Sequence, residues 1–186
     1  MKIKTWNGVI GIVSRVAEIG YFLFSVLCGG LAFFSLVKGS AAVDAVLFSN
    51  GGDASIGTNG FAIAIAGKSG EALPAALTLL LIVGVFTMFC MGMIFRNVRL
   101  IFKSADVGGE TLFNADVIRM VREIGFFCIA VPVIGFVALA VGRLILGADL
   151  EASVQLHGFA LGFVVLCLSQ FFARGMELER EVEGLL

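Results

Sequence analysis

The chain has 186 residues, of which 59% are hydrophobic and 15% are charged, and its mean hydropathy is +1.04. Soluble domains are about 45–50% apolar and about 25% charged, so this apolar surplus exceeds what a soluble fold could bury. The formal net charge of −1 excludes a broadly basic surface, and no direct nucleic-acid binding is expected. The composition therefore predicts an integral membrane protein.

Four apolar stretches are each long enough to cross a bilayer as a helix, which requires about 20 residues. They comprise residues 19–37, 73–95, 124–146 and 152–173. The sequence predicts an all-α integral membrane fold, a bundle of four transmembrane helices that forms one membrane domain over residues 1–186. The lipid bilayer is the partner that this fold requires.

The N-terminal flank, residues 1–18, has apolar residues at helical spacing, namely Trp6, Ile10, Val13 and Val16. Two interpretations are open: a short helix that lies at the headgroup level, or a simple extension of the first span. A cleaved signal peptide is disfavoured because the apolar core that follows is longer than the 7–15 residues typical of such peptides.

The loop over residues 38–72 contains two apolar runs, 43–48 and 61–66. Glycine and asparagine at 49–53 and 57–60 favour turns between them, so a small β-hairpin-like structure is predicted, with a disordered loop as the alternative. Bulky and small residues alternate after residue 60, which gives one bulky face that could lie on the membrane surface or on the helix bundle.

Two further connections follow in the chain. In the loop over residues 96–123, Gly108 and Gly109 break any helix, and Thr111 or Asn114 can cap a new helix that begins near Asp116. The connection over residues 147–151 is short, so the third and fourth spans are predicted to be antiparallel neighbours.

The orientation follows from the distribution of basic residues. Ten of the 13 basic residues fall in the N-terminal flank, in the 96–123 loop or in the tail, residues 174–186. Because cytoplasmic segments carry the excess of lysine and arginine, both termini are predicted to be cytoplasmic and the 38–72 loop extracytoplasmic. The expected location is a bacterial plasma membrane, with several passes.

Polar residues gather near the outer end of the last two spans: Arg143, Asp149, Glu151, Gln155 and His157. They form either an interfacial cluster that satisfies itself or a proton-sensing or substrate-binding cluster. His157 is the single histidine and has no cysteine or acid at ligand spacing, so no metal or cofactor is expected.

The cysteines and glycines of the spans have mainly packing roles. All four cysteines lie in apolar runs without a C-x-x-C pair, and we expect free thiols. Gly158 and Gly162 form a GxxxG pair that permits close approach of two helices. This pair serves either packing within the chain or a homo-oligomer.

Two segments on the predicted cytoplasmic side resemble one family. The first contains Gly109, Phe113, Asp116, Arg119, Arg122, Ile124 and Gly125, which is similar to a G-x-x-P-F pattern followed by a basic stretch that ends R-x-I-G. The second is the tail, with Phe172, Gly175, Glu177, Leu178, Glu181 and Glu183, which resembles F-x-x-G-x-x-L-Q-x-E-x-D-E-T-L. The family is the bacterial four-pass membrane family named domain of unknown function 2975. Leu112 stands where that family usually has proline.

The resemblance implies a membrane partner for a small cytoplasmic helix-turn-helix regulator. The implied contact residues are Phe113, Arg119, Arg122, Gly175, Glu177, Leu178, Glu181 and Glu183. From the residues themselves, no nucleophile with a base and no pair of acids can be identified, so an enzyme is not expected. The favoured hypothesis is a non-enzymatic membrane protein that senses or sequesters, and the alternative is a small transporter or channel, or an accessory subunit of one.

Overall fold

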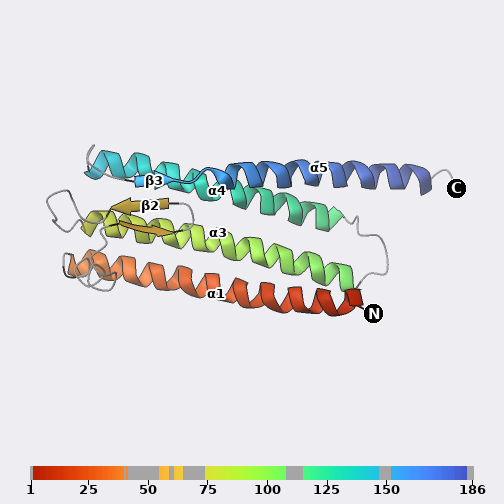
Figure 1. Cartoon of the computed structure of the whole chain (residues 1–186), viewed down its shortest axis with the longest axis horizontal. Helices are drawn as coiled ribbons and strands as arrows, with labels where there is room; N and C mark the ends of the chain where they lie inside the picture. The colour runs from red at the N-terminus through yellow and green to blue at the C-terminus, as the bar shows by residue number, and fades with distance from the viewer. Residues whose placement is uncertain are drawn as a thin grey trace. The chain divides into compact units, whose positions relative to one another are not determined.

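A computed structural model describes residues 2–39, 41, 55–58, 61–64, 74–107, 115–146 and 152–183 of the chain. The long helices of this part are α1 (Lys2–Lys38), α3 (Pro74–Val107), α4 (Ala115–Leu146) and α5 (His157–Glu183) (Figure 1). By length and composition, four helical stretches could cross a membrane: Gly8–Lys38, Pro74–Ser104, Ala115–Ile145 and His157–Leu178. The prediction of four long apolar helices is confirmed.

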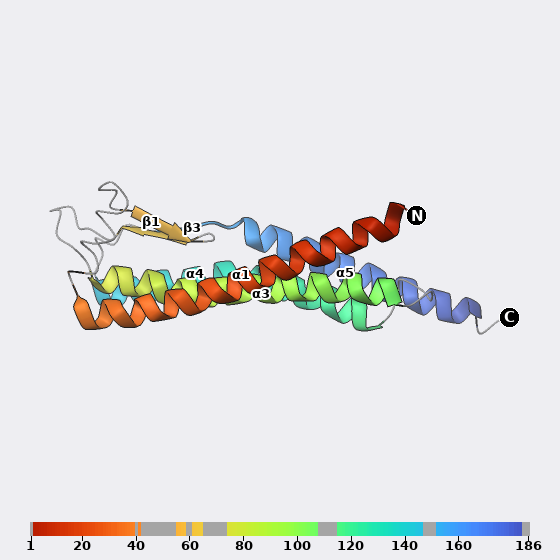
Figure 2. The same ribbon diagram turned by 90° about the horizontal axis from the view of Figure 1, so that it is seen from below.

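Helix α1 is continuous from the N-terminal flank through the first apolar stretch (Figure 2). The flank is therefore part of the same helix as the first apolar stretch, as expected of an extension of that span. The helix ends at Gly39, whose φ of 57° lies in the left-handed region and whose N–H donates to the carbonyl of Ser35 at 2.9 Å. This is a common helix C-terminus, since glycine adopts that conformation without the steric cost of a side chain.

The helices around the predicted 96–123 loop are longer than expected. Helix α3 begins at Pro74, a residue suited to the first helical turn, and continues to Val107, beyond residue 95, where the predicted span ended. Its polar end contains arginine and lysine, which are good helix formers once the apolar stretch has ended. Helix α4 begins at Ala115, directly after Asn114, as the capping pattern predicted.

A three-stranded antiparallel sheet has the order β1 (Ser55–Thr58), β2 (Phe61–Ala64), β3 (Ala152–Val154). The hairpin predicted in the 38–72 loop is confirmed, and β2 is one of its two predicted strands. The strand that pairs with β2 is β1, which includes Gly57 and Thr58, where a turn was predicted. The apolar run 43–48, expected to be the other strand, lies outside the described residues.

The third strand corrects the predicted fourth span. Residues 152–154 were expected to begin that span, but they pair with β2, so that Phe61 lies opposite Val154 and Ile63 opposite Ala152. Helix α5 starts only at His157. Backbone hydrogen bonding to β2 competes with the helix there, and Val154 is β-branched, which favours a strand.

The chain divides into two compact units, which we describe separately. The sheet unit comprises Tyr21–Phe89 and Ala130–Gly158, and the terminal unit comprises Met1–Gly20, Cys90–Ile129 and Phe159–Leu186.

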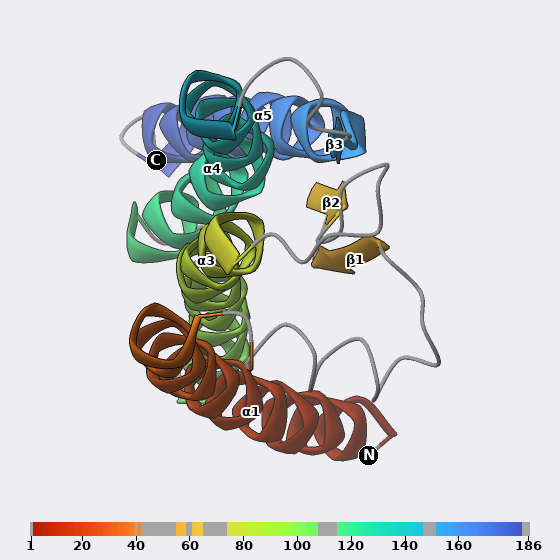
Figure 3. The same cartoon turned by 90° about the vertical axis from the view of Figure 1, so that its left-hand side faces the viewer.

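The core of the sheet unit lies where β2 meets the helices. Phe61 and Ile63 are 2% and 1% exposed and pack with Leu77, Leu80 and Val83 of α3 and Ala138 of α4. Viewed along the helices, the sheet lies beside α3 and α4 (Figure 3). The bulky face of β2 therefore lies on the helices, one of the two predicted positions.

Candidate functional site

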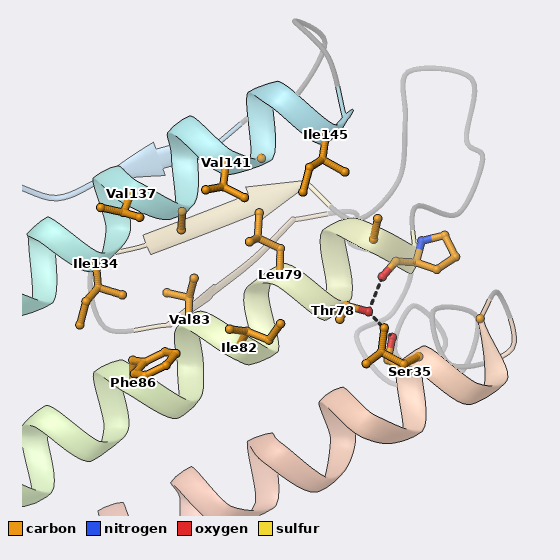
Figure 4. A pocket seen from close by; sticks show the side chains of 16 residues that line it. Ser35, Thr78, Leu79, Ile82, Val83, Phe86, Ile134, Val137, Val141 and Ile145 are labelled. Carbon is orange, nitrogen blue, oxygen red and sulfur yellow. Dashed lines mark hydrogen bonds between the residues drawn. The ribbon is translucent and has the colours of Figure 1, made fainter.

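A pocket of about 600 Å³ lies in the sheet unit between α1, α3 and α4 (Figure 4). We call it the apolar pocket. Its walls are Ser35, Leu36 and Gly39 of α1, seven residues of α3 between Pro74 and Phe86, and six residues of α4 between Ile134 and Ile145. Small-molecule sites usually have volumes of about 300–1,000 Å³, so the pocket is large enough to be one.

The polar side chains of the apolar pocket bind each other. Thr78 Oγ1 donates to the carbonyl of Pro74 at 2.9 Å, and Ser35 Oγ lies 3.0 Å from Thr78 Oγ1. Because a threonine hydroxyl has one hydrogen, Ser35 donates to Thr78 in this arrangement. Both hydroxyl hydrogens are therefore used within the protein, and the remaining lining side chains are apolar.

An ion pair connects α1 and α3 in the terminal unit. Arg99 Nε donates to Glu18 Oε2 at 2.7 Å, and Arg99 Nη2 donates to Glu18 Oε1 at 3.3 Å. The side chains are 29% and 13% exposed, respectively, so the pair is partly removed from solvent. Two-point pairing of this kind restricts the orientation of both side chains.

A second polar group in the same unit connects α3 to α4. Asn97 is 3% exposed, and its Nδ2 donates to Glu123 Oε2 at 3.3 Å. Arg119 Nε donates to the other oxygen of Glu123 at 3.1 Å. Glu123 thereby accepts from both helices and gives the buried amide nitrogen of Asn97 a hydrogen-bond acceptor.

Helices α4 and α5 approach closely in the terminal unit. A Cβ added to Gly162 would lie 2.6 Å from Ile129 Cγ1 and 2.8 Å from the carbonyl oxygen of Gly125. A Cβ on Gly125 would lie 2.8 Å from Leu166 and 3.2 Å from the carbonyl oxygen of Gly162. For Gly162, packing within the chain is confirmed; the homo-oligomer stays a prediction.

The residues predicted to bind a cytoplasmic partner lie in the terminal unit. Arg119 and Arg122 on α4 are exposed, as are Glu177, Leu178 and Glu181 on α5, while Gly175 is half-buried. Glu183 ends helix α5, and Phe113 lies outside the described residues.

The predicted outer polar cluster is represented by three described residues. Arg143 lies in the last turn of α4, His157 begins α5, and Gln155 precedes it; all three are exposed. No hydrogen bond or ion pair joins these three side chains. Asp149 and Glu151 lie outside the described residues.

All four cysteines are free, as predicted. Within the described ranges, no group of three or more histidine, cysteine, aspartate or glutamate side chains could hold a metal ion.

Sequence reasoning missed the ion pair, the Asn97–Glu123 contact and the apolar pocket. A signal for the first two was present, because Glu18 and Glu123 each directly precede an apolar stretch. An acid at the start of one apolar stretch is expected at the same level as a residue just after the end of an antiparallel stretch. Arg99 follows the end of such a stretch, so an acid can pair with it. No such signal exists for the pocket, whose residues are indistinguishable in type from the other residues of the apolar stretches.

No protein-family model matches this chain, and no curated protein or solved structure is significantly similar to it. The resemblance to the family named domain of unknown function 2975 therefore stays a prediction.

Proposed function

We propose that this chain is a non-enzymatic, multi-pass protein of a bacterial plasma membrane that binds a cytoplasmic regulator through the end of α5. One observation carries the proposal. By length and composition the stretch able to cross a membrane runs to Leu178, and its charged end, from Arg174 on, continues as helix to Glu183. Of the side chains described at this end, Arg174, Glu177, Leu178 and Glu181 are exposed, whereas Met176 is half-buried.

The chemistry of this helix end favours a basic partner. Leu178 is 62% exposed and lies between the exposed carboxylates of Glu177 and Glu181. One apolar anchor flanked by acids suits a partner surface with an apolar hollow and a basic rim. A helix-turn-helix regulator has such a basic surface where it contacts DNA. Binding here would compete with DNA, so the membrane protein would sequester the regulator.

The membrane placement rests on two arguments. Four helices that can each cross a bilayer put both termini on one side, and the positive-inside rule makes that side the cytoplasm. Reporter fusions test this orientation. A green fluorescent protein after residue 186 should fluoresce, and alkaline phosphatase should be active when inserted between residues 41 and 54 but not when fused after residue 186. The opposite pattern would refute the placement.

Site-specific crosslinking in intact cells tests the partner. A photoreactive residue in place of Leu178 should give a crosslinked product with a small soluble protein. The matched control is Leu168 on the same helix, which is 45% exposed within the apolar stretch and should crosslink only to lipid. The charge reversals Glu177→Lys and Glu181→Lys should remove the protein product, whereas Arg15→Glu on exposed α1 surface should not. Equal products at both leucines would contradict the proposal.

The alternative, a small transporter or channel, stays a prediction. Flux of a solute panel into proteoliposomes would test it, with empty vesicles as the control.

A further inference from the structure

We propose that the apolar pocket of the sheet unit binds one acyl chain of a membrane phospholipid. The proposal rests on the membrane placement proposed above but not on the partner proposed for α5, because it concerns only α1, α3 and α4 of the sheet unit. Its basis is the length of the pocket, the composition of its walls and the charge beside its end.

The pocket has the length of one membrane leaflet. From Pro74 to Phe86 the separation is twelve residues, or about 18 Å at 1.5 Å per residue. From Ile134 to Ile145 it is eleven residues, or about 16 Å on α4. The hydrocarbon core of a bilayer is about 30 Å thick, so one leaflet supplies about 15 Å of acyl chain. An extended chain in one leaflet therefore matches the pocket from end to end.

The walls of the pocket suit hydrocarbon. Val137, Val141 and Ile145 of α4 and Ile82 and Phe86 of α3 are between 38% and 68% exposed, so this chain covers their side chains only in part (Figure 4). The hydroxyl hydrogens of Ser35 and Thr78 are already used, so the wall offers no unpaired donor that would select a polar ligand. A flexible alkyl chain can fill a concave apolar surface closely and gain dispersion energy along its length.

A positive charge lies next to the end of the pocket. Gly39 is a lining residue at the C-terminus of α1, and Lys38 precedes it with an exposed side chain. Lys38 makes no ion pair or hydrogen bond with any other described residue. Pro74, where α3 begins, lines the same end, so this end lies where the apolar helices finish. A phospholipid whose chain fills the pocket would place its phosphate at that level, within reach of the long lysine side chain.

Photo-crosslinking in vesicles tests the proposal with the full chain. The probe is a phosphatidylcholine that carries a diazirine on one acyl chain, and labelled residues are identified by mass spectrometry of peptides. Label per unit of exposed area should be several-fold higher at Ile82 and Val137 than at Leu144. Leu144 is the matched control because it lies on α4, is 87% exposed and does not line the pocket.

A second pair of variants separates the pocket from ordinary boundary lipid. Val141→Trp fills the pocket and should reduce the label at Ile82 several-fold, whereas Leu144→Trp should leave that label unchanged. Both variants must elute as a single species in detergent. The proposal would be overturned if the amount of label were proportional to the exposed area at every position. It would also be overturned if Val141→Trp, in a folded protein, left the label at Ile82 unchanged. Strong pocket label by diazirine palmitic acid, but not by the phospholipid, would overturn the assignment to phospholipid.

Discussion

Glu18 and Arg99 form a two-point ion pair between α1 and α3, with the shorter N–O distance at 2.7 Å. The two residues are 81 positions apart in the chain. The pair lies beside the start of the uncharged part of α1. It therefore determines which residues of α1 and α3 lie at the same level in the terminal unit.

Removing one member of this pair should destabilise the protein. Glu18→Ala leaves the guanidinium of Arg99 without its acceptor, so we expect a loss of about 1.5–3 kcal/mol in the free energy of unfolding. Thermal unfolding in detergent measures the change. The control Arg15→Ala, on exposed surface of the same helix, should change stability by less than about 0.5 kcal/mol. Partial recovery in the exchanged variant, Glu18→Arg with Arg99→Glu, would show that the two charges act together.

The close contact of α4 and α5 predicts opposite effects for two glycines of one helix. Gly162→Ala places a methyl group 2.8 Å from the carbonyl oxygen of Gly125, so we expect a destabilisation of about 1–3 kcal/mol from the forced shift. Gly175→Ala meets nothing within 4 Å and should be neutral or stabilise by up to about 1 kcal/mol, since alanine is the better helix former. Equal unfolding temperatures for both variants would argue against this packing.

The hydroxyl pair of the apolar pocket should contribute a small amount to stability. Thr78→Val keeps the shape of the side chain and removes both hydrogen bonds, and Ser35→Ala removes one of them. In membrane helices such bonds average about 0.6 kcal/mol in double-mutant cycles. The double variant should therefore lose less than the sum of the single losses. Strict additivity would mean that the two hydroxyl groups do not interact.

Phe61 should be important for docking the sheet on the helices. Phe61→Ala deletes a side chain that is 2% exposed, and such deletions cost about 3–5 kcal/mol. Limited proteolysis should then cut the segments next to β2 much faster than in the parent protein. Leu156→Ala, at a position 57% exposed just after β3, is the control and should leave the cleavage rate unchanged.

Sequence reasoning predicted the helices better than the sheet. An apolar stretch such as Pro74–Phe95 can be identified from its own residues, because the free energy of transfer into lipid is a sum over local side chains. The pairing of Phe61 with Val154 cannot be identified from local residues, because the two residues belong to separate connections of the chain. The sequence around residue 152 is apolar enough for either structure, and the neighbouring strand decides between them.

The candidate site likewise has some features that the sequence predicted and others that only the structure showed. Exposed charges at the end of α5 were predicted, because a charged segment after an apolar stretch must leave the hydrocarbon wherever it lies. The partner of Glu18 and the walls of the apolar pocket were not predicted, since Ile82 and Val141 do not differ in type from lipid-facing residues.

The sequence alone determined that the chain has four helices able to cross a membrane, the apolar stretches at their centres, and that its cysteines are free. Only the tertiary structure decided that Arg99 pairs with Glu18, that β3 completes the sheet, and that a pocket lies between α1, α3 and α4. The physical reason is that hydrophobic transfer depends on each residue and its immediate neighbours, whereas ion pairs, strand partners and cavities depend on which distant segments meet.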